Sequence, residues 1–444
     1  MWFLPLGGTG EIGMNMNLYG HDHQWLMVDC GVTFDESLKV VDGVGVGPKH
    51  DVVCADPSFI TRQKENLAGI IITHAHEDHI GALPYLWHRF KCPVYTTAYT
   101  AEILRRKLAR DGSNPNIPII EVKTDETQII GPFEVKWLNI THSIPEPHAL
   151  VINTSVGNIF HTADWKIDAN PVVGKPFDPS PFKALSKQDI LAMVCDSTNA
   201  TRAGHSISEY QCYQGLKQLI DSAKGRVVVG CFSSNIARLI TLAKIAKHTG
   251  RYLSLFGRSL QNTVGAAKAT GHWPEDLEVI DSYHTGYLLP EEVLAVATGS
   301  QGEPRAALSR LAQDSFRDVS LDAGDTVIFS SIIIPGNEKP IENLIKRFNA
   351  RNIKTVLADE SEYTIHASGH PCAEELQLMY GWVEPQVAVP THGEQVHMIA
   401  NAAIAKQSGV RRSLTGKNGD LFMLAPNIGI KREAVSTGRI VIQQ

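Results

Sequence analysis

The run His74-Ala75-His76-Glu77-Asp78-His79 carries the side chains best suited to chemistry. Three imidazoles and the carboxylate of Asp78 fall within six residues, and these are ligand types that a borderline-soft cation such as Zn²⁺ takes. His74 and His76 are two residues apart and can reach one metal together, whereas Asp78 and His79 suit a second metal beside it. A solvated polar loop is the alternative, but this density of ligand types favours metal binding.

The elements on either side predict how this run is positioned. The apolar run 67–73 predicts a buried strand, and Leu83, Leu86 and Trp87, at helical spacing after Ile80, predict a helix. We therefore expect the run on a strand-to-helix loop, where its side chains are free to converge.

Two more histidines and an aspartate follow predicted strands. Residues 133–138 alternate apolar and polar side chains, which predicts a strand leading to His142. A second strand, 387–390, ends just before His392. Asp29 closes a strand near the N-terminus, where a carboxylate can orient a metal ligand or a metal-bound water. From that stretch alone, a turn-forming Asp29 is the better interpretation.

A predicted hairpin delivers Asp164. Two apolar runs, 150–156 and 159–162, predict paired strands with a two-residue turn at Gly157-Asn158. Asp164 then follows a strand, as His142 does, so these groups are expected to meet at one edge of a sheet sandwich. A carboxylate has two oxygens and can bridge two cations.

Composition limits the class of protein. The chain has 444 residues with 43% hydrophobic and 20% charged residues, which predicts a globular protein of two or three domains. The formal net charge of −6 gives no support for a nucleic-acid binder, so any such site must rest on a local basic surface. Seven cysteines without a C-x-x-C pair indicate reduced thiols. No signal peptide or membrane-spanning run is predicted, so we expect a cytoplasmic protein without membrane association.

The pattern in the middle of the chain predicts a further α/β layer with parallel strands. A strand at 225–230, a helix at 234–247 and a strand at 251–256 predict a parallel α/β arrangement. The segment 231–258 contains no acidic residue, so it predicts a basic surface for a phosphate backbone. An ordinary solvated helix face is the alternative, and charge alone leaves both open. The basic residues are Arg238, Lys244, Lys247, Arg251 and Arg258.

Two loops offer groups that bind phosphate. Ser233, Ser234 and Asn235 precede the predicted helix and offer hydroxyl and N–H groups. The loop His366-Ala367-Ser368-Gly369-His370 combines two imidazoles, a hydroxyl and a glycine that permits close approach, just before another helix. The turn Gln301–Arg305 is predicted only as a loop near the cleft.

A series of motifs resembles the ribonuclease J family, within the β-CASP branch of the metallo-β-lactamase fold. They cover nearly the whole chain in order: Gly10–Met16, Thr73–Leu83, Thr141–Pro145, His161–Asp164, Cys195–Ala200, Phe232–Asn235, Thr298–Pro304, Ile334–Glu338, His366–His370 and Pro390–Glu394. The resemblance implies an α/β fold: a metallo-β-lactamase αββα sandwich in two parts, 1–197 and 359–444, with an inserted β-CASP α/β domain at 198–358. Family members usually carry a further C-terminal domain, so ending at Gln444 predicts a short form that is a monomer or a weak homodimer.

The resemblance also implies roles for the candidate residues. Two cations are expected, zinc with manganese also compatible, in two ligand sets that share Asp164: His74, His76 and His142 in one, and Asp78, His79 and His392 in the other. A shared water would attack phosphorus in line, oriented by Asp29 and Asp78. His370, with Asp196 as its carboxylate partner, would protonate the leaving 3′-oxygen. RNA phosphate would be held by Ser233, Ser234, Asn235, His366, Ala367, Ser368, Gly369 and His370.

The function implied is a metal-dependent ribonuclease that leaves 5′-phosphates, with endonuclease and 5′→3′ exonuclease activity both possible. One alternative is a nuclease of the same fold that acts on DNA or on transfer-RNA precursors. A catalytically silent RNA-binding subunit is a second, and the seven intact ligand positions argue against it. A small-molecule hydrolase is a third, and the basic segment and the His366–His370 loop argue against that one.

Overall fold

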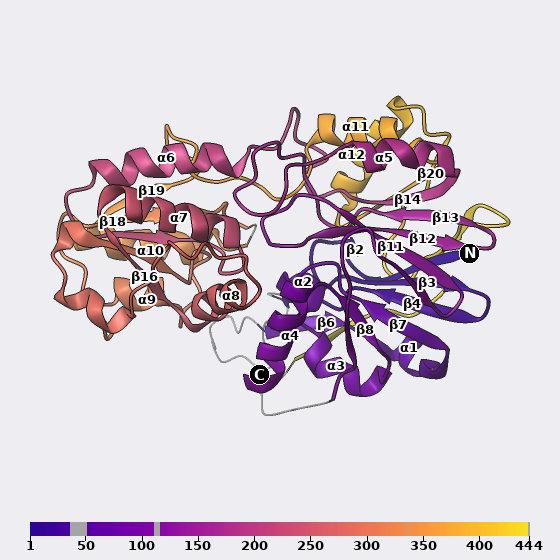
Figure 1. The fold of residues 1–444 in the computed structure, drawn as a ribbon, viewed down its shortest axis with the longest axis horizontal. Helices are drawn as coiled ribbons and strands as arrows, with labels where there is room; N and C mark the ends of the chain where they lie inside the picture. Colours follow the sequence, from indigo (N-terminus) through magenta and orange to yellow (C-terminus); the bar gives the residue numbers. More distant parts are fainter. Residues whose placement is uncertain (36–50, 111–115, 335, 443–444) are drawn as a thin grey trace, which may run out of the picture.

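The structure is a computed structural model and describes residues 1–35, 51–110, 116–334 and 336–442. Two lobes lie side by side (Figure 1): a larger one that contains both ends of the chain and a smaller one formed by its middle. Pro335, part of the motif Ile334–Glu338, lies outside the described residues. Across the described ranges, no helix is both long and apolar enough to cross a membrane. All seven cysteines are described, and each is buried and unpaired.

Two sheets form the centre of the larger lobe. The first has eight strands, in the order β24 (Gly429–Lys431), β23 (Leu421–Met423), β1 (Trp2–Gly7), β3 (Met16–His21), β4 (Gln24–Val28), β7 (Leu67–Ile71), β8 (Val94–Thr96) and β9 (Ile119–Glu121). The second has seven, in the order β10 (Thr127–Ile130), β11 (Phe133–Asn139), β12 (His148–Thr154), β13 (Gly157–His161), β14 (Ile190–Asp196), β20 (Val387–Thr391) and β22 (Arg412–Ser413). Small pairings add β2 (Thr9–Gly10) to β21 (Gly393–Glu394), and β5 (Val32–Asp35) and β25 (Arg439–Val441) to β6 (Asp51–Ala55).

The core of this lobe lies between the two sheets. Val28 and Ile71 of the first sheet share a buried cluster with Trp137, Leu150 and Val194 of the second. The alternation in β11 places Phe133, Val135 and Trp137 on the inward face, because successive side chains of a strand point to opposite faces. The alternating strand predicted for 133–138 is therefore confirmed.

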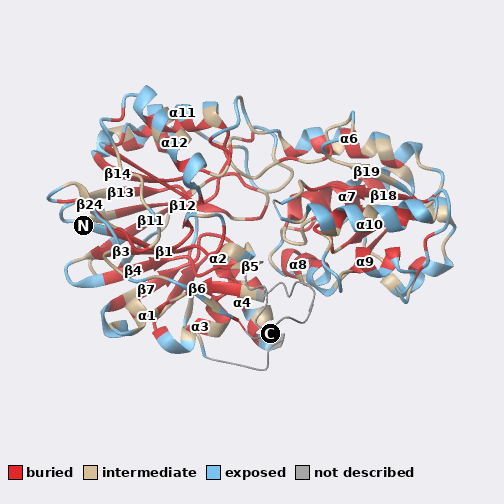
Figure 2. Cartoon of the chain, turned by 180° about the vertical axis from the view of Figure 1, so that it is seen from behind, coloured by how far each residue is buried: buried red, intermediate tan, exposed pale blue. Residues whose placement is uncertain are grey.

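Helices cover the outer face of each sheet. Buried side chains of α1 (Ser58–Thr61), α3 (Leu83–Phe90) and α4 (Ala98–Arg110) pack on the eight-stranded sheet. Those of α5 (Ser180–Ala184), α11 (Ala373–Val383) and α12 (Gln395–Gln407) pack on the seven-stranded sheet. The layers run helix, sheet, sheet, helix (Figures 1 and 2), which confirms the predicted αββα sandwich.

The smaller lobe contains a five-stranded parallel sheet. Its order is β16 (Tyr252–Phe256), β17 (Val293–Ala297), β15 (Val227–Gly230), β18 (Thr326–Phe329) and β19 (Lys354–Leu357). The helices α6 (Glu209–Ser222), α7 (Ile236–Thr249) and α8 (Arg258–Ala269) cover one face, and α9 (Ala307–Ala312) and α10 (Glu338–Ala350) the other. The predicted parallel α/β layer is confirmed, while the boundaries at 198 and 358 stay a prediction.

The chain leaves the larger lobe and returns to it at adjacent strands. β14 and β20 pair in parallel, with Asp196 opposite Thr391. The smaller lobe is therefore an insertion between two neighbouring strands of one sheet. Because parallel neighbours end at the same edge, Asp196 and His392 are brought to the same place.

The hairpin that precedes Asp164 differs in one detail from the prediction. Its strands β12 and β13 pair from Leu150 opposite His161 to Thr154 opposite Gly157. The two-residue turn is therefore Ser155-Val156, and the predicted turn at Gly157-Asn158 is wrong. Gly157 instead begins the second strand with a φ of 148°.

Candidate metal centre

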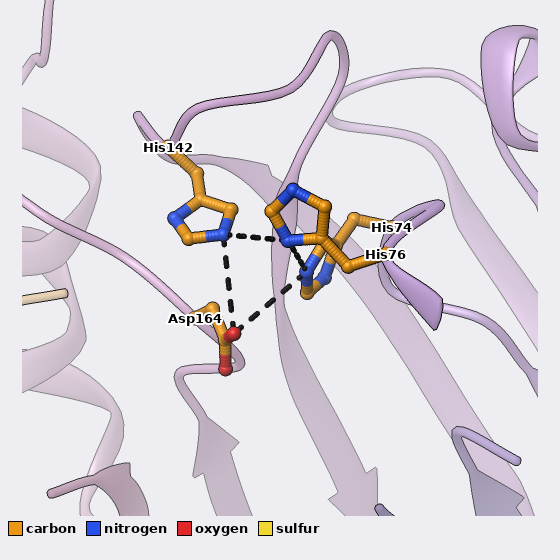
Figure 3. A group of neighbouring side chains, drawn as sticks. All are labelled: His74, His76, His142 and Asp164. Carbon is orange, nitrogen blue, oxygen red and sulfur yellow. Dashed lines mark hydrogen bonds and ion pairs between the residues drawn. The ribbon is translucent and has the colours of Figure 1, made fainter. Parts of the chain in front are cut away.

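The loop after β7 places His74 and His76 so that their ring nitrogens converge with that of His142. Nδ1 of His76 lies 3.1 Å from Nε2 of His74 and 3.0 Å from Nε2 of His142, which follows β11 (Figure 3). Around one tetrahedral zinc with bonds of 2.0–2.1 Å, ligand nitrogens are ~3.3 Å apart. The three nitrogens therefore converge as ligands of a single ion would.

Asp164 lies between this group and a second one. Its Oδ2 is 3.8 Å from Nε2 of His74 and 3.9 Å from Nε2 of His142. The same oxygen is 3.2 Å from Nε2 of His79, and Oδ1 is 3.0 Å from Nδ1 of His392. Ala163, just before it, has a φ of 52°, which turns the chain sharply at the end of β13. One carboxylate thus faces both histidine groups.

The second group joins Asp164 to three residues from two segments of the chain. Oδ2 of Asp78 lies 3.5 Å from Nε2 of His79 and 3.3 Å from Nε2 of His392. Asp78 and His79 belong to the short helix α2 (Glu77–Ile80), and His392 follows β20 with a φ of 47°. The seven predicted ligands thus converge in two sets that share Asp164.

A third set of side chains borders these two. Nδ1 of His370 lies 2.8 Å from Oδ2 of Asp196 and 3.9 Å from Oδ2 of Asp164. The other oxygen of Asp196 accepts hydrogen bonds from the backbone N–H and the hydroxyl of Thr198. The carboxylate is therefore fixed from one side and holds His370 from the other, beside Asp164.

Asp29 contacts one of the predicted metal ligands. Its carboxylate is buried, and Oδ2 accepts a hydrogen bond of 2.8 Å from Nδ1 of His79. The backbone N–H of Thr73 donates to Oδ1, and the hydroxyl of Thr73 lies 3.0 Å from both oxygens. Asp29 is thus placed to orient His79 with Nε2 toward the site, the usual way in which an outer carboxylate fixes a ligand histidine, while a role in orienting a water stays a prediction.

A backbone carbonyl performs the same task for His142. Nδ1 of His142 donates a hydrogen bond of 2.6 Å to the carbonyl of Gly369. A Cβ added to Gly369 would lie 2.5 Å from that Nδ1, far inside ordinary contact. Gly369 is therefore required by close approach to the imidazole, and the contact joins the predicted phosphate loop to a predicted metal ligand.

Charge differs between the two ligand sets. Burial, reinforced by neighbouring imidazoles, holds the pKa of His74 and His142 well below the usual value, and burial lowers the pKa of His76 to about 4. Burial also opposes charge on His79 and His392, but nearby carboxylates, Asp164 foremost, outweigh it and raise the pKa of both. The three histidines of the first set are therefore held in the uncharged form that binds a cation, whereas His79 and His392 lie where carboxylates attract positive charge.

Two buried atoms support a cation at the junction of the sets. Among the described residues, Oδ1 of Asp164 and Nε2 of His392 are buried and make no hydrogen bond of good geometry, although they face Nδ1 of His392 at 3.0 Å and Oδ2 of Asp78 at 3.3 Å. A buried polar atom without a partner is costly, and carboxylate oxygen and imidazole nitrogen are both metal ligands. The donor set therefore fits divalent metal ions.

The predicted phosphate-binding residues lie beside this centre. The turn that holds Ser233 and Ser234 precedes α7, whose Ala237 N–H lies 3.5 Å from the carbonyl of Ser143, next to His142. Asn235 is nearly buried, and its side-chain oxygen accepts from the N–H of Arg238, so it caps α7. Phosphate binding by these residues stays a prediction.

Asn199 is a site residue that the sequence did not single out. Its side-chain amide donates to Oγ of Ser368 at 2.8 Å and to the carbonyl of His370 at 3.3 Å. It therefore supports the His366–His370 loop from the turn after β14. Its only signal in the sequence is its place within the motif Cys195–Ala200.

The predicted basic surface is wrong for two of its five residues. Arg238 is completely buried against Glu209, and Arg251, 8% exposed, donates to backbone carbonyls. The other three, Lys244, Lys247 and Arg258, are exposed.

The predicted loop Gln301–Arg305 makes a structural contact. Gln301 is buried, and its side chain donates to the carbonyl of Ile332 and accepts from the N–H of Ile334. The turn therefore connects the end of β17 to the loop after β18.

Comparisons with known proteins agree with this geometry. Residues 10–189 match the metallo-beta-lactamase superfamily, residues 224–348 the ribonuclease J beta-CASP domain, and residues 360–412 the Zn-dependent metallo-hydrolase RNA specificity domain. A solved structure of a protein of unknown function from Enterococcus faecalis V583 has the same fold, with a TM-score of 0.63 at 15% identity over 95% of this chain and 99% of that one.

Curated relatives extend the match to almost the whole chain. Ribonuclease J of Sinorhizobium meliloti is 44% identical over 442 residues, which is 99% of this chain and 77% of the relative. Ribonuclease J of Mycolicibacterium smegmatis is 34% identical over 98% of this chain and 77% of the relative. The chain therefore belongs to the ribonuclease J family, in which a β-CASP domain is inserted into a metallo-β-lactamase domain.

Proposed function

We propose that this metal-dependent ribonuclease cleaves RNA at the centre around Asp164, with two divalent metal ions. Asp164 would be shared between the two ligand sets: His74, His76 and His142 in one, and Asp78, His79 and His392 in the other. The observation that carries the proposal is that Asp164 faces both sets, which together provide five imidazoles and two carboxylates. When bound, two such ions lower the pKa of a water and stabilise the charge that develops on a phosphoryl group.

Zinc is the proposed metal. Imidazole nitrogen dominates the donor set, and zinc combines well with nitrogen and carboxylate ligands. Manganese is compatible with the same donors.

His370 is proposed as the group that donates a proton to the leaving 3′-oxygen. Burial opposes charge on His370, but Asp196 and Asp164 outweigh it and raise its pKa, which favours the protonated imidazole that a proton donor needs. Its Nδ1 faces Asp196, which leaves Nε2 as the donating atom. Asp78, half-buried at the edge of the second set, is proposed to orient the attacking water. The product would carry a 5′-phosphate.

The loop His366–His370 and the turn with Ser233 and Ser234 are proposed to hold an RNA phosphate. Burial, followed by the charge of Arg238, lowers the pKa of His366 to about 3. Among the described residues, both ring nitrogens of His366 are buried without a hydrogen-bond partner. A neutral imidazole offers one N–H donor, and a phosphate oxygen would reach it only after a rearrangement of the loop. A site of this kind could recognise the phosphate at the 5′ end of an RNA, and both endonuclease and 5′→3′ exonuclease activity are compatible with it.

The oligomeric state, a monomer or a weak homodimer, stays a prediction.

Cleavage of end-labelled RNA tests the proposal. Purified protein of known metal content is incubated with one sequence as 5′-monophosphate RNA, 5′-triphosphate RNA and DNA. We expect the RNA to be cut to products with 5′-phosphates, and we expect Asp164→Asn to lose both metal and cleavage. His205→Ala, which alters an exposed histidine outside the centre, is the control. Full cleavage by Asp164→Asn, or none by metal-loaded wild-type protein, would show that the proposal is wrong.

A further inference from the structure

A buried ion pair lies behind the predicted phosphate loop. Arg238, in the first turn of α7, is completely buried, and Glu209, in the first turn of α6, is 4% exposed. Nε and one terminal nitrogen of the guanidinium donate to the two oxygens of Glu209, at 2.5 and 3.0 Å. This two-point geometry is the strong form of an arginine–carboxylate contact.

The other terminal nitrogen of Arg238 reaches the segment that leads to the loop. It donates to the carbonyl of Ser330 at 3.0 Å and to the carbonyl of Ile365 at 2.9 Å. The hydroxyl of Ser330 also donates to the carbonyl of Ile365, at 2.6 Å. Ile365 directly precedes His366. Arg238 therefore fixes the backbone at the point where the His366–His370 loop begins.

Glu209 connects the same pair to the larger lobe. Its backbone N–H donates to Asp168, and the hydroxyl of Ser208 donates to the same carboxylate at 2.7 Å. Asp168 pairs with the buried Lys166 at 3.2 Å, and the hydroxyl of Thr141 donates to the carbonyl of Lys166. Thr141 directly precedes His142.

These contacts close a ring. It runs from the backbone beside His142, through Glu209 and Arg238, to the start of the loop, and returns through the hydrogen bond from His142 to Gly369. Within the ring, Arg238 is the residue that joins α6 and α7 of the smaller lobe to the loop.

We propose that Arg238, held by Glu209, is a positioning residue for RNA cleavage: it fixes the His366–His370 loop relative to His142 and so places His370. This inference rests on the proposed function, because it assumes that His370 acts in the reaction. Arg238 itself is completely buried, and in the part of the chain that the structure describes its guanidinium bonds Glu209, Ser330 and Ile365 and no proposed metal ligand. Lysine cannot replace it, because an ammonium group lacks the planar fork that satisfies Glu209 and two backbone carbonyls together.

A matched control lies at the other end of the same sheet. Arg251, just before β16, is also buried, and it donates to the carbonyls of Gly225, Val293 and Ala223 at 2.7–2.9 Å. Those carbonyls lie at the N-terminal ends of the parallel strands or in the turn before them. Loss of either arginine removes buried hydrogen bonds, but only Arg238 is connected to the loop.

The test compares two variants with wild-type protein. Arg238→Met alone would leave Glu209 buried without a partner, so Glu209→Leu is combined with it, since an apolar pair often replaces a buried ion pair without loss of the fold. The other variant is Arg251→Met. Each is measured for thermal unfolding, metal content, RNA affinity, single-turnover cleavage at saturating RNA, and hydrogen exchange of residues 364–372.

For the double variant we expect faster hydrogen exchange in 364–372 and cleavage slower by roughly 10- to 100-fold, the range associated with an ångström-scale misplacement. Metal content should stay at the wild-type level, and RNA affinity should change much less than the rate. Arg251→Met should keep wild-type exchange in 364–372 and a rate close to wild type.

Unchanged exchange in 364–372 would overturn the inference, and so would an equal loss of rate in both variants. If the double variant does not fold, Arg238→Lys is measured instead, and a wild-type rate per folded molecule there would also overturn it. Absence of cleavage by wild-type protein would refute the proposed function, whereas hydrogen exchange would still report whether Arg238 orders the loop.

Discussion

Gly369→Ala is the substitution for which the structure gives the clearest expectation. Gly369 does not have a positive φ, so alanine fits the backbone and the effect comes from contact alone. The added Cβ would lie 2.5 Å from Nδ1 of His142 and closer still to Cε1, whereas ordinary contact begins at 3.4 Å. The imidazole or the loop must therefore move by about 1 Å, and a shift of this size near reacting groups is associated with a loss of roughly 10²-fold in rate.

Metal binding should weaken as well. The displacement breaks or lengthens the hydrogen bond by which Gly369 orients His142, and loss of such an outer contact weakens metal binding by about 10- to 100-fold. We therefore expect weaker binding in the set of His74, His76 and His142, with the set of His79 and His392 retained. Competition with a chelator measures the two affinities, and single-turnover cleavage of RNA measures the rate.

Gly381→Ala is the matched control. Gly381 is an exposed residue of α11, and an added Cβ would meet no atom within 4 Å. Alanine there should stabilise the helix by ~0.5–1 kcal/mol and leave cleavage unchanged. A Gly369→Ala protein with wild-type affinity for both metals and a wild-type rate would refute the reasoning, because the loop would then not be held against His142.

Four further outcomes are expected. His76→Ala should lose nearly all RNA cleavage and stay folded, because His76 lies on a loop and its ring faces the ligand cluster; thermal unfolding and cleavage of one sample check this. Asp29→Asn should weaken metal binding by about 10- to 100-fold, because His79 loses the carboxylate that orients it; competition with a chelator measures the change, and unaltered affinity would count against the contact. His370→Ala should keep both metals and bind RNA but cleave ~10²–10⁴-fold more slowly; an unchanged rate would exclude the acid role, and a missing metal would make His370 a ligand. Protein purified without chelator should contain two divalent ions per chain by elemental analysis, and a single ion would contradict the shared role of Asp164.

Sequence patterns predicted the ends of strands well, and with them most of the centre. His74, His142 and His392 each follow an apolar or alternating run, and such runs specify a strand and its direction through local periodicity. Ligands placed just after strands that run in the same direction, as β11, β13 and β20 do, then meet at one edge of the sheet. Local patterns therefore predicted that these side chains lie at strand ends, whereas the resemblance to the ribonuclease J family supplied the assignment of seven ligands to two ions.

Contacts between segments that are distant in the sequence could not be predicted from local periodicity. Asp29 lies against His79, a partner that the sequence did not reveal, and Arg238 was expected on a basic surface and lies against Glu209. In both cases the sequence reveals a charge but not the direction in which the side chain points. The turn at Ser155-Val156 was missed because Gly157-Asn158 has the stronger turn composition, while strand pairing decided the register.

The insertion between β14 and β20 has a consequence for the time at which the enzyme becomes active. On the proposed assignments, a growing polypeptide contains the first ligand set once Asp164 has been synthesised, but the second set is incomplete until His392 is added. The interval is about 230 residues, which at ~5–20 residues per second corresponds to roughly 10–45 s. During that interval the nascent protein cannot hold both ions as the finished enzyme does. A ribonuclease arranged in this order is unable to cut the messenger RNA from which it is still being translated until the smaller lobe has been made and the chain has returned to the sheet.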